Sequence, residues 1–380
     1  MMHNSQPMQK VIHSENIKQS LQERGWKQKD LAEALGVTAQ SVTNWLKGSD
    51  FPRPDKLLKL ATTLQLGFDK LVKTDMAGQP VVAFRKKAGV KTTDAHIDKA
   101  MVMGALLKAL VPFLPPMPAL RLQLPAPSTD YEPLQAVVSQ VRARLGLGEE
   151  AAVAYQDLIG EFGANGAVVA PVLWGQKQNH KNALHILLPQ ENVTFIFLNL
   201  DTHLEDFKFW MAHELAHVYT PDLAGKDAGE DFADAFAGAL LFPMTVARKT
   251  YEHARTGTKT VEGKVLTDQA KAYGISLFSV FSEVNRYAHS EGLPPLRHTQ
   301  EQIHQMRQIQ RGKTMSEELF APVPAEPGAY IAATKSTFKS AFFESLQRMI
   351  KNKETGTGYI QQVMDIPMQD AIALHGELID

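Results

Sequence analysis

Short amphipathic segments separated by turn residues make up the beginning of the chain. Between Glu15 and Lys73, apolar residues recur at helical spacing, and glycines at positions 25, 36, 48 and 67 interrupt the pattern. This pattern predicts a module of four or five helices. After Tyr131, some segments have the spacing of apolar residues typical of helices, and others have the apolar runs typical of strands. They predict helices over 134–145 and 151–162, strands over 167–173, 184–188 and 194–200, helices from Phe207 onward, and a helix over 335–351.

Two of the early segments have the spacing of a helix-turn-helix. Leu31 and Leu35 share one face of a helix that begins near Gln28, and Gly36 stands where a left-handed residue would end it. Thr38 can cap a second helix, whose polar face could contact base edges or phosphates in a major groove. Gln28 lies where a helix N-terminus receives a backbone phosphate. The residues of the second polar face are Gln40, Ser41, Thr43, Asn44 and Lys47. A helical protein-interaction bundle with a solvated face is the alternative.

Turn-rich and proline-rich stretches divide the chain into several units. At 380 residues it is two to three times the length of a typical domain. Residues 78–93 show no clear period, and six prolines fall within 112–128, which predicts a hinge or an extended connection. We therefore expect a multidomain α+β protein with an all-α N-terminal bundle, an α+β middle and a mainly helical end. The expected divisions are 1–75, a linker over 76–130, an α+β domain over 131–298, and a regulatory or oligomerisation region over 299–380.

Composition narrows the classes of function that remain. Hydrophobic residues make up 44% of the chain and charged residues 21%, which is typical of a soluble globular protein. The net charge of −1 excludes a uniformly basic coat, although residues 1–75 carry 11 Lys and Arg against 8 Asp and Glu. The absence of cysteine excludes disulfides and every cysteine-ligated metal site. The longest apolar stretch, 101–120, is interrupted by Lys108 and prolines, so no membrane span is expected, and a cytoplasmic location follows.

A second motif carries metal chemistry. His213-Glu214-Leu215-Ala216-His217 places two imidazoles one turn apart on a helix, which suits a shared Zn²⁺ ion with Glu214 as general base. An open catalytic site needs a third protein ligand. Glu230 can supply it, and Asp234 on the same face can accept a hydrogen bond from a ligand histidine. Asp231 is a rival ligand, because helix phase is uncertain from sequence. The alternatives are a metal-free remnant or a surface helix with two ordinary histidines.

Both motifs resemble known families. The segments 28–38 and 42–48 resemble the phage-repressor (XRE/Cro) helix-turn-helix family, whose members contact operator DNA, usually as dimers; a homodimer is therefore one expectation. The segments 210–217 and 230–243 are similar to the ImmA/IrrE metallo-endopeptidases, a resemblance that extends from about Leu134 to Ala288. It implies a zincin-like, gluzincin-type fold and a Zn²⁺ cofactor. It also implies cleavage of a transcriptional repressor or similar regulator that releases stress or mobile-element genes.

These resemblances lead to two main hypotheses. In the first, the chain binds an operator and is a zinc endopeptidase that cuts a repressor, an antitoxin-like protein, or itself between about Gly78 and Ser128. In the second, it is a DNA-binding repressor or antitoxin whose zincin domain is non-proteolytic and serves sensing or dimerisation. A weaker third hypothesis is a zinc hydrolase whose N-terminal helices bind protein. The sequence offers Tyr219, His203 and His185 as oxyanion donors, and an exposed edge over 194–200 as a strand that could hold substrate.

Overall fold

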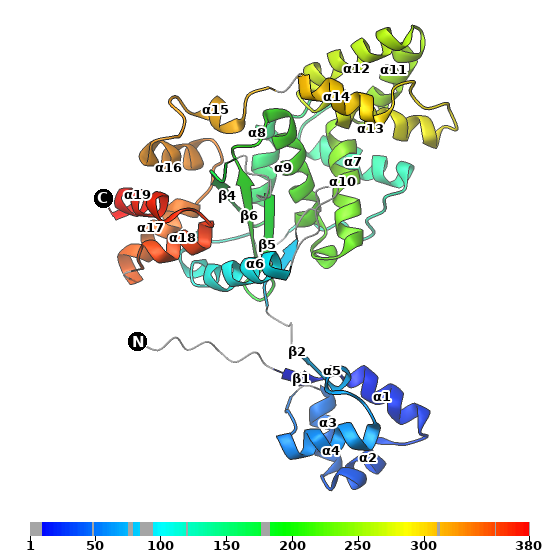
Figure 1. The fold of residues 1–380 in the computed structure, drawn as a ribbon, viewed down its shortest axis with the longest axis vertical. Helices are drawn as coiled ribbons and strands as arrows, with labels where there is room; N and C mark the ends of the chain where they lie inside the picture. Colours follow the sequence, from blue (N-terminus) through cyan, green and yellow to red (C-terminus); the bar gives the residue numbers. More distant parts are fainter. Residues whose placement is uncertain are drawn as a thin grey trace. The chain divides into compact units, whose positions relative to one another are not determined.

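In a computed structural model, the chain divides into two compact units, Met1–Ala77 and Gly78–Asp380 (Figure 1). The structure describes residues 10–47, 49–74, 79–83, 94–118, 121–175, 183–309, 312–353 and 355–379. Most of the predicted hinge at 78–93, together with Gly48, lies outside these residues. The second unit includes nearly all of the linker predicted over 76–130 and the predicted C-terminal region, and the finer division between them remains a prediction.

The first unit is the predicted helical module. Its helices are α1 (Ser14–Glu23), α2 (Gln28–Leu35), α3 (Ala39–Lys47), α4 (Pro54–Leu64) and α5 (Phe68–Leu71). Gly36 ends α2 in the left-handed conformation, at φ 66°, and the Thr38 hydroxyl accepts a hydrogen bond from the Ser41 amide at 3.1 Å. Leu31, Leu35, Val42 and Trp45 are buried in one core. A short antiparallel ribbon of β1 (Lys10–Ile12) and β2 (Val72–Thr74), which the sequence pattern did not predict, pairs the two ends of the module.

A four-stranded sheet forms the centre of the second unit, in the order β3-β5-β6-β4. Its strands are β3 (Val81–Ala83), β4 (Ala167–Val172), β5 (Ala183–Leu188) and β6 (Val193–Asn199). β4 runs parallel to β6, whereas β5 is antiparallel to both β6 and β3. Every residue of β4, β5 and β6 is buried, because helices cover both faces. The three predicted strands are confirmed, and β3 is an additional strand in a stretch that was interpreted as a connection.

One face of the sheet carries the helices that build the candidate site. These are α8 (Tyr155–Ala164) and α9 (Leu204–Tyr219), with α7 (Tyr131–Arg144) and α10 (Asp227–Leu241) beside them (Figure 1). A short 3₁₀ turn, η2 (Pro221–Leu223), joins α9 to α10. Arg142 is buried and donates a hydrogen bond to the Leu240 carbonyl at 2.6 Å, so α7 is tied to the C-terminal end of α10. This contact fixes the helix that carries the expected third ligand.

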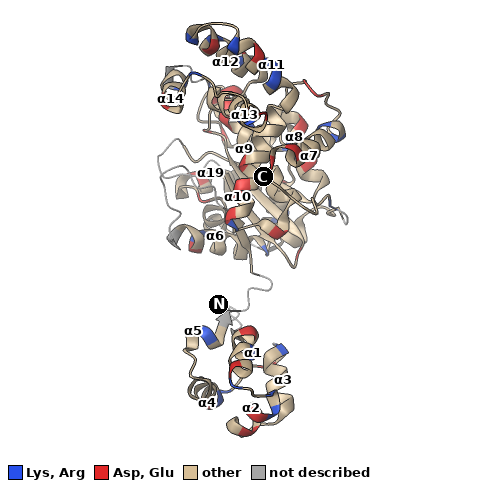
Figure 2. Cartoon of the chain, turned by 90° about the vertical axis from the view of Figure 1, so that its right-hand side faces the viewer, with Lys and Arg blue, Asp and Glu red and all other residues tan. Residues whose placement is uncertain are grey.

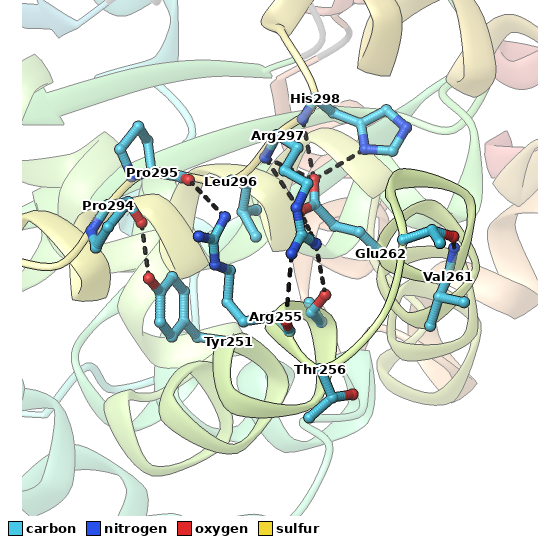
Figure 3. A network of polar contacts seen from close by, with 12 residues as sticks. Tyr251, Arg255, Thr256, Val261, Glu262, Pro294, Pro295, Leu296, Arg297 and His298 are labelled. Carbon is cyan, nitrogen blue, oxygen red and sulfur yellow. Dashed lines mark hydrogen bonds and ion pairs between the residues drawn. The ribbon is translucent and has the colours of Figure 1, made fainter.

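A group of helices follows α10 and packs against it. They are α11 (Met244–Arg255), α12 (Lys259–Tyr273), α13 (Leu277–Ser290) and α14 (Gln300–Ile309). The carboxylate of Glu262 on α12 is fully buried and accepts hydrogen bonds from the backbone amides of Arg297 and His298, at 2.8 and 2.9 Å, and from His298 Nδ1 at 2.9 Å (Figure 3). Burial alone would raise the pKa of Glu262, but these donors lower it. The buried carboxylate thus holds the segment after α13 against α12.

The opposite face of the sheet is contacted by α6 (Asp94–Leu107) and α17 (Phe342–Lys353). The 3₁₀ turn η1 (Val111–Phe113), α16 (Pro327–Ser336) and α19 (Met368–Ile379) pack on α17, and α18 (Thr357–Met364) packs on α6. In α15 (Met315–Leu319), the Ser316 amide donates to the Leu200 carbonyl just after β6, at 2.7 Å. The helical stretch predicted over 335–351 is confirmed over 342–351 by α17 and is wrong as one continuous helix. α16 and α17 are separated at 337–341, where the Ser340 hydroxyl donates to the Val169 carbonyl and Phe342 turns its ring onto Phe197, 6.2 Å between centroids. Among the described residues, no helix is long and apolar enough to cross a membrane.

Candidate metal centre

Helix α9 places the two motif histidines and the glutamate between them in the interior. Phe207, Met211 and Leu215 bury its apolar side, and the histidines point to the neighbouring helix. His213 and His217 are each 1% exposed and Glu214 is 2% exposed. The Nε2 atoms of His213 and His217 lie 3.2 Å apart. The predicted convergence of two imidazoles from one helical turn is therefore present in the geometry.

Helix α10 brings Glu230 to the same point. Its carboxylate oxygens lie 3.5 Å from His213 Nε2 and 3.3 Å from His217 Nε2. Its rival Asp231 is exposed, so helix phase selects Glu230. Burial would raise the pKa of Glu230, but hydrogen bonds from the two histidines lower it to about 2. The carboxylate is therefore ionised at neutral pH, as a metal ligand must be.

Asp234 lies one helical turn beyond Glu230 and contacts the far side of the first histidine. Its Oδ1 is 2.9 Å from His213 Nδ1, while its own side chain is 47% exposed. Burial would lower the pKa of His213, but the hydrogen bonds to Asp234 and Glu230 raise it to about 9. A carboxylate on Nδ1 fixes the ring orientation and leaves Nε2 directed at Glu230. The structure thus brings together all four residues that the sequence placed around the metal.

The donor set fits a small divalent cation. His213, His217 and Glu230 offer ligand atoms that all lie within 4.8 Å of one another. Two ligands bound at about 2.0–2.1 Å to a tetrahedral ion stand about 3.3–3.4 Å apart. The two Nε2 atoms, 3.2 Å apart, match that spacing, and Glu230 reaches each imidazole with a different oxygen, Oε2 at 3.5 Å from His213 and Oε1 at 3.3 Å from His217. Two imidazoles that bind through an unprotonated Nε2, His213 giving up its proton when the ion binds, and one carboxylate are also a donor set that zinc accepts, with a fourth position left for water.

His185 on β5 is the one oxyanion candidate that the structure places beside Glu214. It is 1% exposed, and its Nδ1 lies 3.3 Å from Glu214 Oε2. Burial lowers the pKa of His185 more than Glu214 raises it, which favours the neutral imidazole. The other two candidates are engaged elsewhere. The Tyr219 hydroxyl donates to Glu161 at 2.8 Å, and His203 Nδ1 lies 2.8 Å from the Gly312 carbonyl.

The strand expected to hold substrate is not available for that role. Residues 194–200 form most of β6, which the sequence pattern indicated as an exposed edge. β6 instead pairs with β4 on one side and with β5 on the other. Because both of its edges are already hydrogen-bonded, β6 cannot accept a further strand. The prediction of a free edge at 194–200 is wrong.

The candidate DNA-contacting residues lie on or beside α3, and none of them is buried. Gln40 donates to Asn44 at 2.8 Å along the helix, and Thr43 donates to Gln28 at 3.3 Å across the turn. Ser41 bonds to the capping Thr38 at 2.8 Å, and Lys47 is exposed at the end of α3. Figure 2 shows acidic as well as basic residues on the helices of this unit. The expected polar face is therefore present without a strong positive charge.

Comparison with known families supports both halves of this description. Residues 17–71 match the sequence model of the helix-turn-helix family, and residues 175–280 match that of the IrrE N-terminal-like domain, a peptidase family. No curated protein matches the chain. The first match spans the helical module, and the second runs from the end of β4 into α13 and contains every residue of the candidate metal centre. The chain thus combines an XRE-type helix-turn-helix with an IrrE/ImmA-like peptidase segment, and the expected α+β multidomain fold class is confirmed.

Proposed function

We propose that the chain is a zinc-dependent endopeptidase joined to a DNA-binding unit. Its substrate in this proposal is a transcriptional repressor or antitoxin-like protein, or the chain itself, and cleavage controls stress or mobile-element genes. The observation that carries the proposal is the triangle of ligand atoms from His213, His217 and Glu230, with Glu214 on the same helix. The matches to a helix-turn-helix and to a peptidase family support both halves.

In this proposal, each side chain around the metal centre has a separate role in peptide hydrolysis. Zn²⁺ held by the three ligands would acidify a water molecule and polarise the scissile carbonyl. Glu214, buried on the helix that carries both histidine ligands, would take a proton from the attacking water and return it to the leaving amine. Asp234 orients His213, and His185 lies next to Glu214, with its Nδ1 3.3 Å from Glu214 Oε2.

In the same proposal, the N-terminal unit binds operator DNA. In the proposal, Gln40, Ser41, Thr43 and Asn44 face the major groove, while Gln28 and Lys47 meet phosphates. Binding as a homodimer and a cytoplasmic location belong to the same proposal. Its competitor is a DNA-binding repressor or antitoxin whose peptidase-like segment senses a signal or dimerises without cutting.

Glu214→Gln separates the two functions. The zinc-loaded chain is incubated alone and with a candidate repressor protein, and fragments are identified by mass spectrometry. The wild-type chain should produce defined fragments, and Glu214→Gln should produce none while keeping its zinc and its operator binding. Asp231→Asn, an exposed carboxylate change on α10, is the matched control and should cut normally. Identical fragment patterns from wild type and Glu214→Gln, or none from either, would favour the non-proteolytic competitor.

A further inference from the structure

The outer edge of β5 borders the candidate metal centre. β5 carries His185, whose imidazole lies 3.3 Å from Glu214, and β5 pairs with β6 along its inner edge. An extended peptide could add to the outer edge as a further strand, antiparallel or parallel to β5. It would then run next to His185, and so close to the candidate metal centre. Among the strands the structure describes, β5 is therefore the one suited to present a peptide to Glu214.

That edge is occupied by the chain's own β3. Val81 pairs with Leu187, Val82 with Ile186 and Ala83 with His185, in antiparallel register. The opposite side of β3 faces the connection between α9 and α10. A Cβ atom placed on Gly225 in that connection would lie 3.3 Å from the Val82 carbonyl oxygen. β3 therefore lies between β5 and the segment that links the two ligand-bearing helices.

From this placement we infer that the outer edge of β5 is the peptide-binding site, and that β3 occupies it as an internal substrate mimic. The inference rests on the proposed function, which it deepens by naming how the substrate is held. The preferred peptide is an extended antiparallel segment with small apolar residues, because Val-Val-Ala at 81–83 is the sequence that pairs with β5 now. A substrate must displace β3 before it can reach the metal centre.

The way β3 is held makes such an exchange reasonable. Among the described residues, three pair with β5, so few ladder hydrogen bonds must be replaced. Its anchor is Pro80, which packs so closely on α6 that a Cβ at Gly104 would lie 2.4 Å from the proline Cβ. Because β3 is tethered, its effective concentration at β5 is on the order of millimolar. A free peptide must overcome that local concentration, which keeps the site closed to weak ligands.

A reversible cross-link tests the inference. The chain contains no cysteine, so Val82→Cys/Ile186→Cys forms the one disulfide that can arise within it. Directly opposed residues of an antiparallel pair have Cα atoms about 4.5–5.5 Å apart, which a disulfide can span. Ile186 lies against Gly104 of α6, on the sheet face away from His185, so the cross-link leaves the centre intact. The companion variant, Val81→Asp/Val82→Asp, places charges that disfavour docking of β3.

The probe is a fluorescein-labelled peptide with the sequence of residues 78–85, and binding is measured by fluorescence anisotropy. All chains carry Glu214→Gln, so the readout does not depend on cleavage. We expect at least ten-fold tighter binding to the aspartate variant than to the parent, and at least ten-fold weaker binding to the oxidised cross-linked chain than to the same chain after reduction. Circular dichroism checks that each variant is folded. If the aspartate variant is unfolded, the comparison of the oxidised with the reduced cross-linked chain tests the inference by itself.

Two results would overturn the inference. One is equal peptide binding to the oxidised and reduced forms of the cross-linked chain. The other is that the peptide binds neither the reduced cross-linked chain nor the folded aspartate variant. A second comparison separates this failure from that of the proposed function. If the cross-linked chain with native Glu214 cleaves equally well in both redox states, the proposed function stands and the inference fails. If the peptide binds as expected but no chain with native Glu214 cleaves a substrate, β5 is still the peptide-binding site and the proposed endopeptidase function fails.

Discussion

Glu283 on α13 should make the stability of the second unit depend on pH near neutrality. Its side chain is 4% exposed, and Oε1 lies 3.3 Å from Arg286 Nη1, whereas Oε2 has no hydrogen-bond partner among the described residues. Burial raises the pKa of Glu283 from 4.5 to about 7, and the nearby guanidinium opposes this shift only in part. The carboxyl is therefore partly protonated at neutral pH in the folded chain.

The sign and size of the effect follow from this pKa. Because the folded state holds the proton more tightly than the unfolded state, the contribution of Glu283 to stability is fully present below pH 4.5 and is lost as pH rises to about 7. At about 1.4 kcal/mol for each pH unit, that interval corresponds to a loss of about 3 kcal/mol. Glu283→Gln keeps the shape and cannot ionise, so it should be more stable than wild type by up to about 3 kcal/mol at pH 8.

Urea unfolding at pH 4.5, 6 and 8 measures the difference in free energy of unfolding between wild type and Glu283→Gln. Calorimetry at the same three pH values provides a second measurement. The two chains should agree within about 1 kcal/mol at pH 4.5 and separate progressively as pH rises. Glu291→Gln, an exposed carboxylate change at the end of the same helix, is the control and should match wild type throughout. If Glu283→Gln is instead least stable relative to wild type at pH 8, the buried carboxylate is ionised and paired, and the reasoning is wrong.

Four further predictions concern packing, the metal and DNA. Gly238→Ala should cost about 1–3 kcal/mol in thermal unfolding, because its Cβ would stand 2.2 Å from a carboxylate oxygen of α13. Glu262→Gln should cost about 3 kcal/mol by urea unfolding, since the amide replaces a buried carboxylate that accepts several hydrogen bonds; a cost below about 0.5 kcal/mol would contradict that role. Asp234→Asn should weaken zinc affinity about 10- to 100-fold in competition with a chelator, and unchanged affinity would remove its orienting role. In gel shifts, Asn44→Ala should lose preference among operator sequences, whereas Lys47→Ala should weaken binding to all of them and lower its salt dependence.

The candidate site was predictable because its information is local. Two histidines four residues apart must share a helical face, and the spacing from Glu230 to Asp234 puts both on one face of the next helix. What the sequence could not fix was the choice between Glu230 and Asp231, which depends on how α10 packs against α9. Likewise, His185 reaches Glu214 only because β5 lies next to the helix, a contact between residues 29 positions apart.

The predictions that failed depend on contacts between distant segments. β3 has three residues, follows a proline and shows no periodicity, so only its pairing with β5 defines it as a strand. Strand order is equally non-local, and for that reason β6 was interpreted as an edge although it lies inside the sheet. The break between α16 and α17 arises where Ser340 bonds to β4, which no helical pattern records.

Metal content tests the central claim most directly. The purified full chain is loaded with Zn²⁺, passed over a desalting column and measured by elemental analysis beside Glu230→Gln, Asp231→Asn and the double change His213→Ala/His217→Ala. We predict one zinc per chain for wild type and Asp231→Asn, a large loss for Glu230→Gln, and none for the double change. Equal zinc in wild type and the double change, or no zinc in wild type, would contradict the account.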